Sequence, residues 1–174
     1  MELRGLRLED EQEARAAHAE LAAEGFTFPF FEPDEAWAEY LSRVERLSRG
    51  DGSAPQLVPW TDLYGVVDGV VVGRVSVRHR LTEGLIQVGG HIGYGVRNAY
   101  RRRGYATELL RVGLGIAHGL GIDRALVTCD DDNVGSAAVI ERCGGVLEDI
   151  RPVADGSPKR RYWVPTMGAA DCGF

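Results

Sequence analysis

Hydrophobic positions recur at helical spacing in two stretches near the start of the chain. One face of residues 10–24 carries Ala14, Ala17, Leu21 and Ala22, and Gly25 follows as a stop. After an aromatic turn over residues 25–31, a second apolar stripe consists of Trp37, Tyr40, Leu41, Val44 and Leu47. This pattern predicts two amphipathic helices, the second beginning near Pro33 and ending at Gly50, followed by a loop over residues 51–59.

The hydrophobic pattern then changes from helical spacing to short runs rich in valine. Residues 63–67 and 70–78 are joined by Asp68-Gly69, a dipeptide that tolerates the positive φ angles of a two-residue hairpin. A third strand is predicted over residues 86–96. Its four glycines, Gly89, Gly90, Gly93 and Gly95, indicate a bulge or a ligand that approaches the backbone closely.

The second half of the chain alternates between the two kinds of pattern. Helices are predicted over residues 104–118 and 133–143, and short strands over residues 125–129, 146–150 and 160–164. The order α-α-β-β-β-α-β-α-β-β predicts an α/β (α+β) layered domain with a mixed, partly antiparallel sheet. At 174 residues, the chain has the length of a single domain that buries roughly 70% of its unfolded surface.

Composition narrows the class of protein. Hydrophobic residues at 44% and charged residues at 26% are close to globular averages. No apolar run has the roughly 20 residues needed to span a bilayer. Residues 1–11 are acidic and lack the basic segment of a secretory signal, so we expect a cytoplasmic protein. An odd set of cysteines without C-x-x-C spacing, Cys129, Cys143 and Cys172, argues against a disulfide framework or a zinc site.

Charge divides the chain into two unequal halves. The net charge is −6, but residues 1–62 hold 14 acids against 6 arginines, whereas residues 63–174 hold 12 acids against 14 bases. This distribution argues against nucleic-acid binding, which needs a basic face, and allows one anionic ligand in the second half. Solubility alone would explain the acidic half equally well.

The segment from Ile92 to Ala106 carries the clearest chemistry. It predicts a strand, a loop with Arg101, Arg102 and Arg103, and a helix beginning near Gly104. Unsatisfied amides at a helix N-terminus attract phosphate, and the small residues leave room for it. A basic loop before a purely structural helix is the competing interpretation.

Other phosphate and metal motifs fail on specific residues. A P-loop needs a glycine-lysine pair, but the only lysine is Lys159, and Asn98 replaces the last glycine of a dinucleotide fingerprint that starts at Gly93. Residues 130–141 approach a calcium loop, yet Val134 supplies no oxygen ligand, and the flanks predict a strand and a helix. We therefore expect no metal here, only a polar strand exit with a capped helix.

Arg101-x-x-Gly104-x-Ala106, five residues after Val96, resembles the signature of the GNAT superfamily of N-acetyltransferases. The resemblance continues through the strand 125–129, Asn133-x-x-Ser136 and Gly144-Gly145, and covers about residues 64–163. The segment Gly90-His-Ile-Gly-Tyr-Gly-Val is similar to a bacterial subgroup whose acceptors are generally unassigned.

This resemblance implies a fold, a co-substrate and a set of contacts. The implied fold is one acyl-CoA N-acyltransferase domain over residues 1–174 with helices on both faces of its sheet. Residues 1–62 would form acceptor-side helices, residues 63–165 the sheet and acetyl-CoA site, and residues 166–174 a tail. The resemblance assigns acetyl-CoA to Tyr94, Gly95, Val96, Arg101, Arg102, Arg103, Gly104, Tyr105, Ala106, Thr107, Asn133 and Ser136. The backbone amide near Val96 would polarise the thioester carbonyl.

The catalytic groups of the resemblance are incomplete in this sequence. The places where relatives carry a base are Ile92 and Gly90, so His91, beside them, becomes the catalytic candidate, with a structural histidine as the alternative. The place of the usual tyrosine acid is Ile140, which leaves Tyr94, Tyr105 or solvent. Glu83 and Glu35 are more distant candidates that solvated charges explain equally well.

The resulting hypothesis is an enzyme that acetylates a primary amine of a small-molecule or peptide acceptor by direct attack in a ternary complex. A non-catalytic acyl-CoA-binding sensor on the same fold is the alternative, since the usual base and acid are missing. We expect no nucleic-acid or membrane partner, and a homodimer is compatible with the sequence. The acidic first half favours cationic acceptors.

Overall fold

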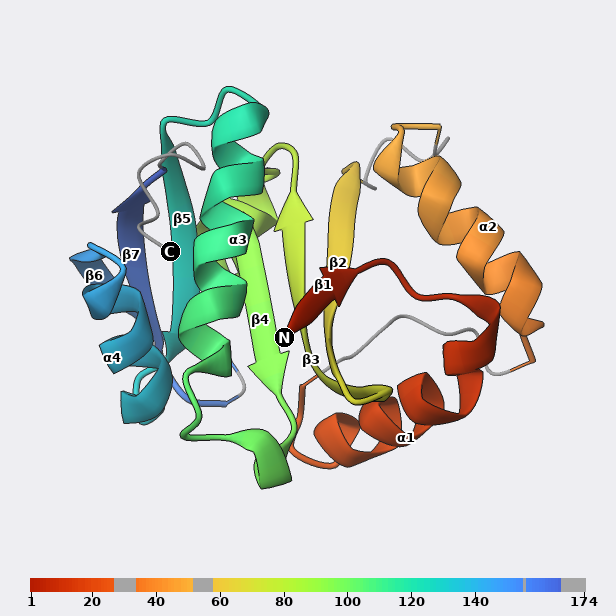
Figure 1. The fold of residues 1–174 in the computed structure, drawn as a ribbon. Helices are drawn as coiled ribbons and strands as arrows, with labels where there is room; N and C mark the ends of the chain where they lie inside the picture. Colours follow the sequence, from red (N-terminus) through yellow and green to blue (C-terminus); the bar gives the residue numbers. More distant parts are fainter. Residues whose placement is uncertain (27–33, 52–57, 155, 167–174) are drawn as a thin grey trace.

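The computed structural model describes residues 1–26, 34–51, 58–154 and 156–166, and its centre is a seven-stranded sheet (Figure 1). The strands follow the order β1-β2-β3-β4-β5-β7-β6. Their bounds are β1 (Glu2–Arg4), β2 (Trp60–Val67), β3 (Val70–Arg78), β4 (Ile92–Val96), β5 (Arg124–Asp130), β6 (Val146–Arg151) and β7 (Lys159–Pro165). Only β4 and β5 are parallel, which confirms the predicted mixed sheet.

The predicted hairpin connects β2 to β3. Asp68 and Gly69 have φ angles of 51° and 81°, and Val67 pairs with Val70 on the other side of the turn. Two successive positive φ angles match the right-handed twist of the two strands, and aspartate and glycine adopt them at low cost. The dipeptide therefore sets the register of both strands.

The structure differs from the predicted strands in two places. The pattern did not predict β1, because its three residues are too few to show an alternation. The strand predicted over residues 86–96 begins only at Ile92. Residues Leu85–Gly89 form a π-helical turn, η2, started by Thr82, which accepts the Ile86 amide at its carbonyl and the Leu85 amide at its hydroxyl. Gly90, with a φ angle of 67°, then leads into β4.

Two pairs of helices cover opposite faces of the sheet, as predicted (Figure 1). The helices are α1 (Glu11–Ala22), α2 (Trp37–Ser48), α3 (Tyr105–Gly119) and α4 (Val134–Arg142), with short 3-10 turns η1 (Leu8–Asp10) and η3 (Asn98–Tyr100). Their bounds agree with the predicted bounds to within a few residues. Pro33, near which the second helix was predicted to begin, lies outside the described residues, and so does Cys172. None of the described helices is long and apolar enough to cross a membrane.

The larger core lies between the sheet and the α3–α4 layer. It includes Val75, Ile92, Val127, Leu109 and Ile140, all with at most 1% of their surface exposed. Smaller cores on the other face join α1 and α2 to β2, where Tyr64 packs against Ala17 and Leu21. The face of the sheet toward α1 and α2 is called the rear face below.

Helix α3 lies close to the sheet because Gly113 has no side chain. A Cβ atom there would lie 2.9 Å from Val75 and 3.1 Å from Ile92. Both distances are tighter than ordinary carbon contacts, so any side chain at this position would push the helix away from β3 and β4. The position of α3, and of the loop before it, depends on this contact.

We expect Gly113→Ala to lower the free energy of unfolding by about 1–2 kcal/mol despite its better helix propensity, because the added methyl group overpacks the core. Gly119→Ala is the matched control in the last turn, where nothing lies within 4 Å of a new Cβ. It should be neutral or stabilising by up to about 1 kcal/mol. Urea denaturation measures both, and equal effects would contradict the packing argument.

Candidate functional site

The candidate site is centred on β4, which pairs fully on one side and hardly at all on the other. Five of its positions pair with β3, whereas its pairing with β5 is limited to Ile92 and Val127. In an antiparallel ladder, the backbone groups of alternate residues face opposite neighbours. The backbone amide of Arg78 donates to the His91 carbonyl, and the backbone amide of Arg97 donates to the Val72 carbonyl. By this alternation, the amides of Tyr94 and Val96 point away from β3, toward β5. An extended ligand can bind there as an added strand does.

The loop after β4 leads into α3 through a left-handed bend. Arg102 and Gly104 have φ angles of 64° and 86°. The first bond of the helix runs from the Glu108 amide to the Gly104 carbonyl, at 3.1 Å, and no side chain caps this end. The amides of residues 105–107 therefore have no partner within the helix, as an anion site requires. Predicted residues 102–107 come together at this end.

Acidic side chains of α1 support the same loop from outside. Glu20 accepts from the Arg97 guanidinium at 2.7 Å and from the Asn98 amide at 3.1 Å, and Glu13 accepts from Arg97 at 3.1 Å. Arg101 pairs with Glu24 and donates to the Val96 carbonyl at 3.0 Å. Arg101 therefore positions the loop in this structure, whereas Arg102 is exposed and pairs with no described carboxylate.

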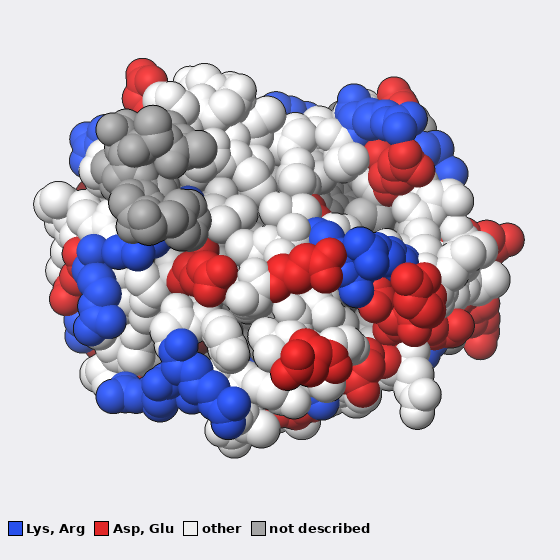
Figure 2. All heavy atoms as spheres, in the orientation of Figure 1, with Lys and Arg blue, Asp and Glu red and all other residues white. Residues whose placement is uncertain are grey.

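Figure 2 shows this separation of charge on the α3–α4 face of the molecule. Lysine and arginine side chains gather at the lower left, around α4 and the start of α3, and acidic side chains gather over α1. The loop therefore lies between a basic surface and an acidic one. A negatively charged ligand would be attracted to the start of α3 from the α4 side.

A hydroxyl network connects β4 to the start of α4. The Tyr94 hydroxyl lies 2.8 Å from the Ser136 hydroxyl, and burial raises the pKa of Tyr94 well above its usual value. Asn133 caps α4 by accepting the Ser136 amide at 3.0 Å. Tyr94, Asn133 and Ser136, predicted from different segments, thus meet at one place. Cys129 is buried beside Ser136, and burial raises the pKa of its thiol.

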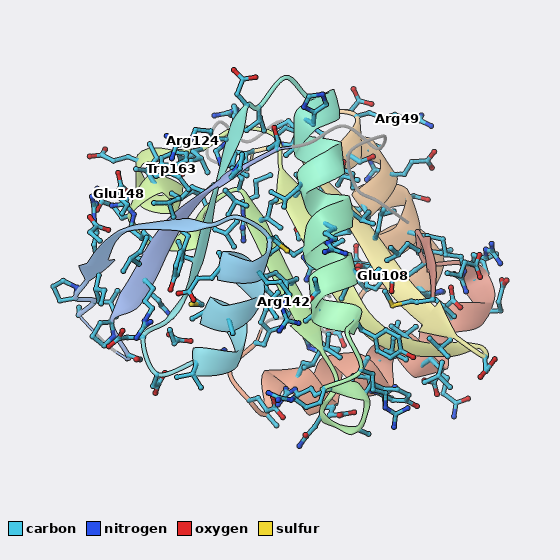
Figure 3. The ribbon with its side chains drawn as sticks, turned by 60° about the vertical axis from the view of Figure 1, so that its left-hand side comes forward. Arg49, Glu108, Arg124, Arg142, Glu148 and Trp163 are labelled. Atoms are coloured by element: carbon cyan, nitrogen blue, oxygen red, sulfur yellow. The ribbon has the colours of Figure 1, made fainter. Side chains whose placement is uncertain are left out.

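His91 connects β4 to β5 at the point where the two strands separate. Its amide donates to the Leu126 carbonyl at 2.6 Å, and its ring Nδ1 accepts the Leu126 amide at 2.9 Å. The ring is 8% exposed and faces Trp163, over which Arg124 lies (Figure 3). Burial, with a smaller effect of Arg78, lowers the pKa of His91. With Nδ1 accepting, the proton of the neutral ring is on Nε2.

The remaining candidates lie apart from β4 or have other partners. Glu35 pairs with Arg43 at 2.6 Å on α2, and Glu83 is exposed before η2. The acids after β5 pair with β7, Asp130 with Lys159 and Asp131 with Arg160. Within the described ranges, no three metal-ligating side chains come together.

Sequence reasoning missed two arginines at this site. Arg97 fixes the loop through α1, and Arg78 lies beside Gly93 on the rear face of β4. A signal for Arg97 was present, because the acids of α1 recur toward one side of the predicted helix. Their partner is more than 70 residues away, and only the fold brings the two together.

Comparisons with known proteins agree with this geometry. A family model described as an acetyltransferase (GNAT) domain matches residues 1–146. No curated protein sequence matches significantly. Solved structures with the same fold include yncA of Salmonella typhimurium, assigned as an acetyltransferase and solved with its cofactor acetyl-CoA. It is 15% identical with a TM-score of 0.63, covering 99% of this chain and 97% of that one.

Two further solved structures are similar at the same level. An acetyltransferase of the GNAT family from Streptococcus pneumoniae is 15% identical, with a TM-score of 0.65, over 96% of this chain and 99% of that one. An N-acetyltransferase from Staphylococcus aureus is 16% identical, with a TM-score of 0.64, over 95% and 98%. Their similarity shows that the fold is shared along nearly the whole chain.

The buried His91 should make the stability of the chain depend on pH. Its folded-state pKa lies below the unfolded value of about 6.5, so the unfolded state binds more protons, and stability should fall as the pH drops below about 6.5. His91→Gln cannot titrate, and we expect a shallower fall in melting temperature between pH 7 and pH 5. The exposed His118→Gln is the control, and an equal slope in all three proteins would contradict the assignment.

Proposed function

The chain belongs to the GNAT acetyltransferase family, and from this premise we propose that it transfers the acetyl group of acetyl-CoA to a primary amine. The acceptor is a small molecule or peptide, attacked directly in a ternary complex. One observation carries the proposal. The unpaired edge of β4 runs directly toward the uncapped start of α3, so an extended amide chain and a phosphate have adjacent sites.

The residues at both ends of this path fit acetyl-CoA. We assign the pyrophosphate to the amides of residues 105–107, with Gly104 leaving space and the exposed Arg102 and Arg103 adding positive charge. The pantetheine amides would pair with the backbone of residues 94–96. Asn133 and Ser136 would lie near its thiol end. Acetyl-CoA supplies the activated acetyl group, a thioester whose carbonyl carbon an amine can attack.

The backbone of β4 would also stabilise the transition state. Attack on a thioester carbonyl places negative charge on its oxygen, and a fixed amide aimed at that oxygen lowers the barrier. We assign this role to the Val96 amide, which points away from β3. The pairing of Gly95 and Val96 with β3 fixes the direction of this amide, and Arg101, which donates to the Val96 carbonyl at 3.0 Å, holds the next peptide of the chain.

Proton transfer is the step with the least help from the protein. An alkylammonium has a pKa of about 10.4, so the amine must give up a proton, which we assign to water, before it attacks. We assign His91 a substrate-orienting role, because its Nδ1 is occupied and Nε2 carries the proton of the neutral ring. The Tyr94 hydroxyl, kept protonated by its raised pKa and lying at the start of α4, is the group we assign to donate a hydrogen bond to the leaving thiolate, which then takes its proton from solvent.

The acetyl-CoA site is tested by two glutamates at opposite ends of α3. Gly104→Glu places negative charge at the proposed pyrophosphate site and should abolish the thermal stabilisation by acetyl-CoA, which is roughly 2.7 kcal/mol at 100 times the dissociation constant. Gly121→Glu is the matched control, since Gly121 also has a positive φ angle and open space around it. Normal acetyl-CoA binding by Gly104→Glu would show that the loop is not the site. Calcium should stabilise none of the proteins.

The transfer reaction is tested by thiol release across polyamines, amino acids, aminoglycosides and peptide amino termini. We expect His91→Ala and Tyr94→Phe each to lower kcat on the order of tenfold while acetyl-CoA affinity changes little, because both act on the reaction rather than on the pyrophosphate. His118→Ala is the control. Unaltered turnover would leave His91 a structural residue. If acetyl-CoA binds but no amine causes the release of CoA thiol, the result would favour a non-catalytic sensor.

A further inference from the structure

The rear face of the sheet carries two arginines on β3 with different surroundings. Alternate residues of a strand share a face, so Arg74, Ser76 and Arg78 lie on the rear face together. Through the registers of β2 and β4, their neighbours are Tyr64 and Gly95 for Arg74, and Asp62 and Gly93 for Ser76. Arg78 comes last, between Trp60 and His91.

The first of these arginines is neutralised by the protein itself. Arg74 and Asp62 are both nearly fully buried, and Asp62 Oδ1 accepts from Arg74 Nη2 at 3.1 Å and from Nε at 3.2 Å. The other carboxylate oxygen accepts the Trp60 indole at 3.1 Å. Both oxygens of Asp62 therefore have other partners, and Asp62 acts on Arg78 only through its charge, which raises the pKa of Arg78 less than burial and Arg74 lower it. Arg74 is thus paired within the protein, and we assign it a structural role on the rear face.

Arg78 has no such partner among the described residues. It is half-buried, and its hydrogen bonds run from Nη1 alone, to the Gly89 carbonyl at 3.3 Å and the Gly90 carbonyl at 3.2 Å. Burial and the charge of Arg74 lower the pKa of Arg78, which reflects a cation without full compensation. Nε and Nη2 take part in no bond to the described part of the chain. These two nitrogens form the side of a guanidinium that binds a carboxylate with two parallel hydrogen bonds.

The guanidinium of Arg78 lies close to the part of β4 to which we assign the pantetheine of acetyl-CoA. Arg78 Nη1 lies 3.8 Å from where a Cβ atom of Gly93 would be, so the head group lies against the rear face of β4. Tyr94, whose backbone we assign to the pantetheine, is the next residue along. An acceptor held by Arg78 would therefore have its amine close to the thioester if its charged groups are only a few bonds apart.

The acids of the first half of the chain do not compensate this charge. Glu13 and Glu20 of α1 pair with Arg97, and Glu24, just after α1, pairs with Arg101. Glu35, just before α2, pairs with Arg43. Many of the acidic side chains that favoured cationic acceptors are thus paired with arginines of the protein itself. The rear face beside Gly93 carries the positive charge of Arg78.

We propose that Arg78 anchors a carboxylate of the acceptor, and that the acceptor is an amino acid whose amine and carboxylate are a few bonds apart. This inference rests on the proposed acetyl transfer and specifies its substrate class. Nη1 is held by the carbonyls of Gly89 and Gly90, which fixes the open side of the guanidinium before the ligand binds. Preorganised, charge-assisted bonds of this kind discriminate strongly between a carboxylate and its uncharged amide.

The test compares amino acids with the same amino acids as amides, and with spermidine, in the thiol-release assay. The native chain should show kcat/KM values roughly 10- to 100-fold higher for the acids than for the amides. Arg78→Gln should remove this preference by lowering kcat/KM for the acids only. Arg78→Lys keeps the charge and a contact to the carbonyls but lacks the paired nitrogens, and should lose most of the preference. Arg80→Gln, at an exposed arginine just after β3, should behave as the native chain.

Two controls separate this proposal from the proposed transfer. The thermal shift with acetyl-CoA should be unchanged in both Arg78 variants, which shows that they fold and bind the donor. If no amine releases thiol, the transfer reaction fails, and calorimetry with CoA-saturated protein still tests the anchor. The anchor would be supported if the native chain binds the amino acids but not their amides, and if Arg78→Gln no longer binds the amino acids. Preference for amides or spermidine, an acid preference that survives in Arg78→Gln, or no acid binding would overturn it.

Discussion

The site depends on the interruption of one pair of strands. Strands β4 and β5 are hydrogen-bonded neighbours at Ile92 and Val127, and beyond that point β4 pairs only with β3. The bend before it requires glycine, because Gly90 has a φ angle of 67° and a Cβ atom there would lie 2.5 Å from the Leu126 carbonyl. His91 then closes the last contact through its amide and its ring. The backbone groups of residues 94–96 stay available for a ligand because the strands separate here.

A second constraint acts on the loop beyond the interruption. A phosphate site needs positive charge, but a loop with several arginines repels itself and has no reason to keep one shape. Helix α1 and the turn after it reduce this repulsion, because Glu13 and Glu20 pair with Arg97, and Glu24 pairs with Arg101. Arg102 and the helix amides stay free of these pairs. The acidic side chains of α1 and of the turn after it therefore support the proposed phosphate site indirectly, by holding its loop.

Local patterns were sufficient for most of the fold and for locating the segments that form the candidate site. The hairpin at Asp68-Gly69, the helical stripes and the glycine before α3 all follow from neighbouring residues, and the structure places them as expected. The strand over residues 86–96 was mispredicted because apolar residues of a π-helical turn look like those of a strand. The partners of Arg97, Arg74 and His91 are distant in sequence, so no local pattern identifies which charges remain uncompensated.

Our proposals assign the two substrates to different sides of β4, the donor to its free edge and the acceptor to its rear face. Along its edge, the strand offers backbone amides, which every residue has, and this suits a donor whose extended chain repeats amide groups. On its rear face, Gly93 and Gly95 offer no side chains, and Phe26 lies against Gly95, so we assign selectivity beside Gly93 to β3 and the η2 segment. Arg78 lies at this junction, bonded to the carbonyls that end η2 and aligned beside Gly93. On our proposal, a change in the residue at position 78 alters the preference for the acceptor and leaves the donor site intact, because the backbone amides that we assign to the donor face β5, whereas Arg78 lies on β3.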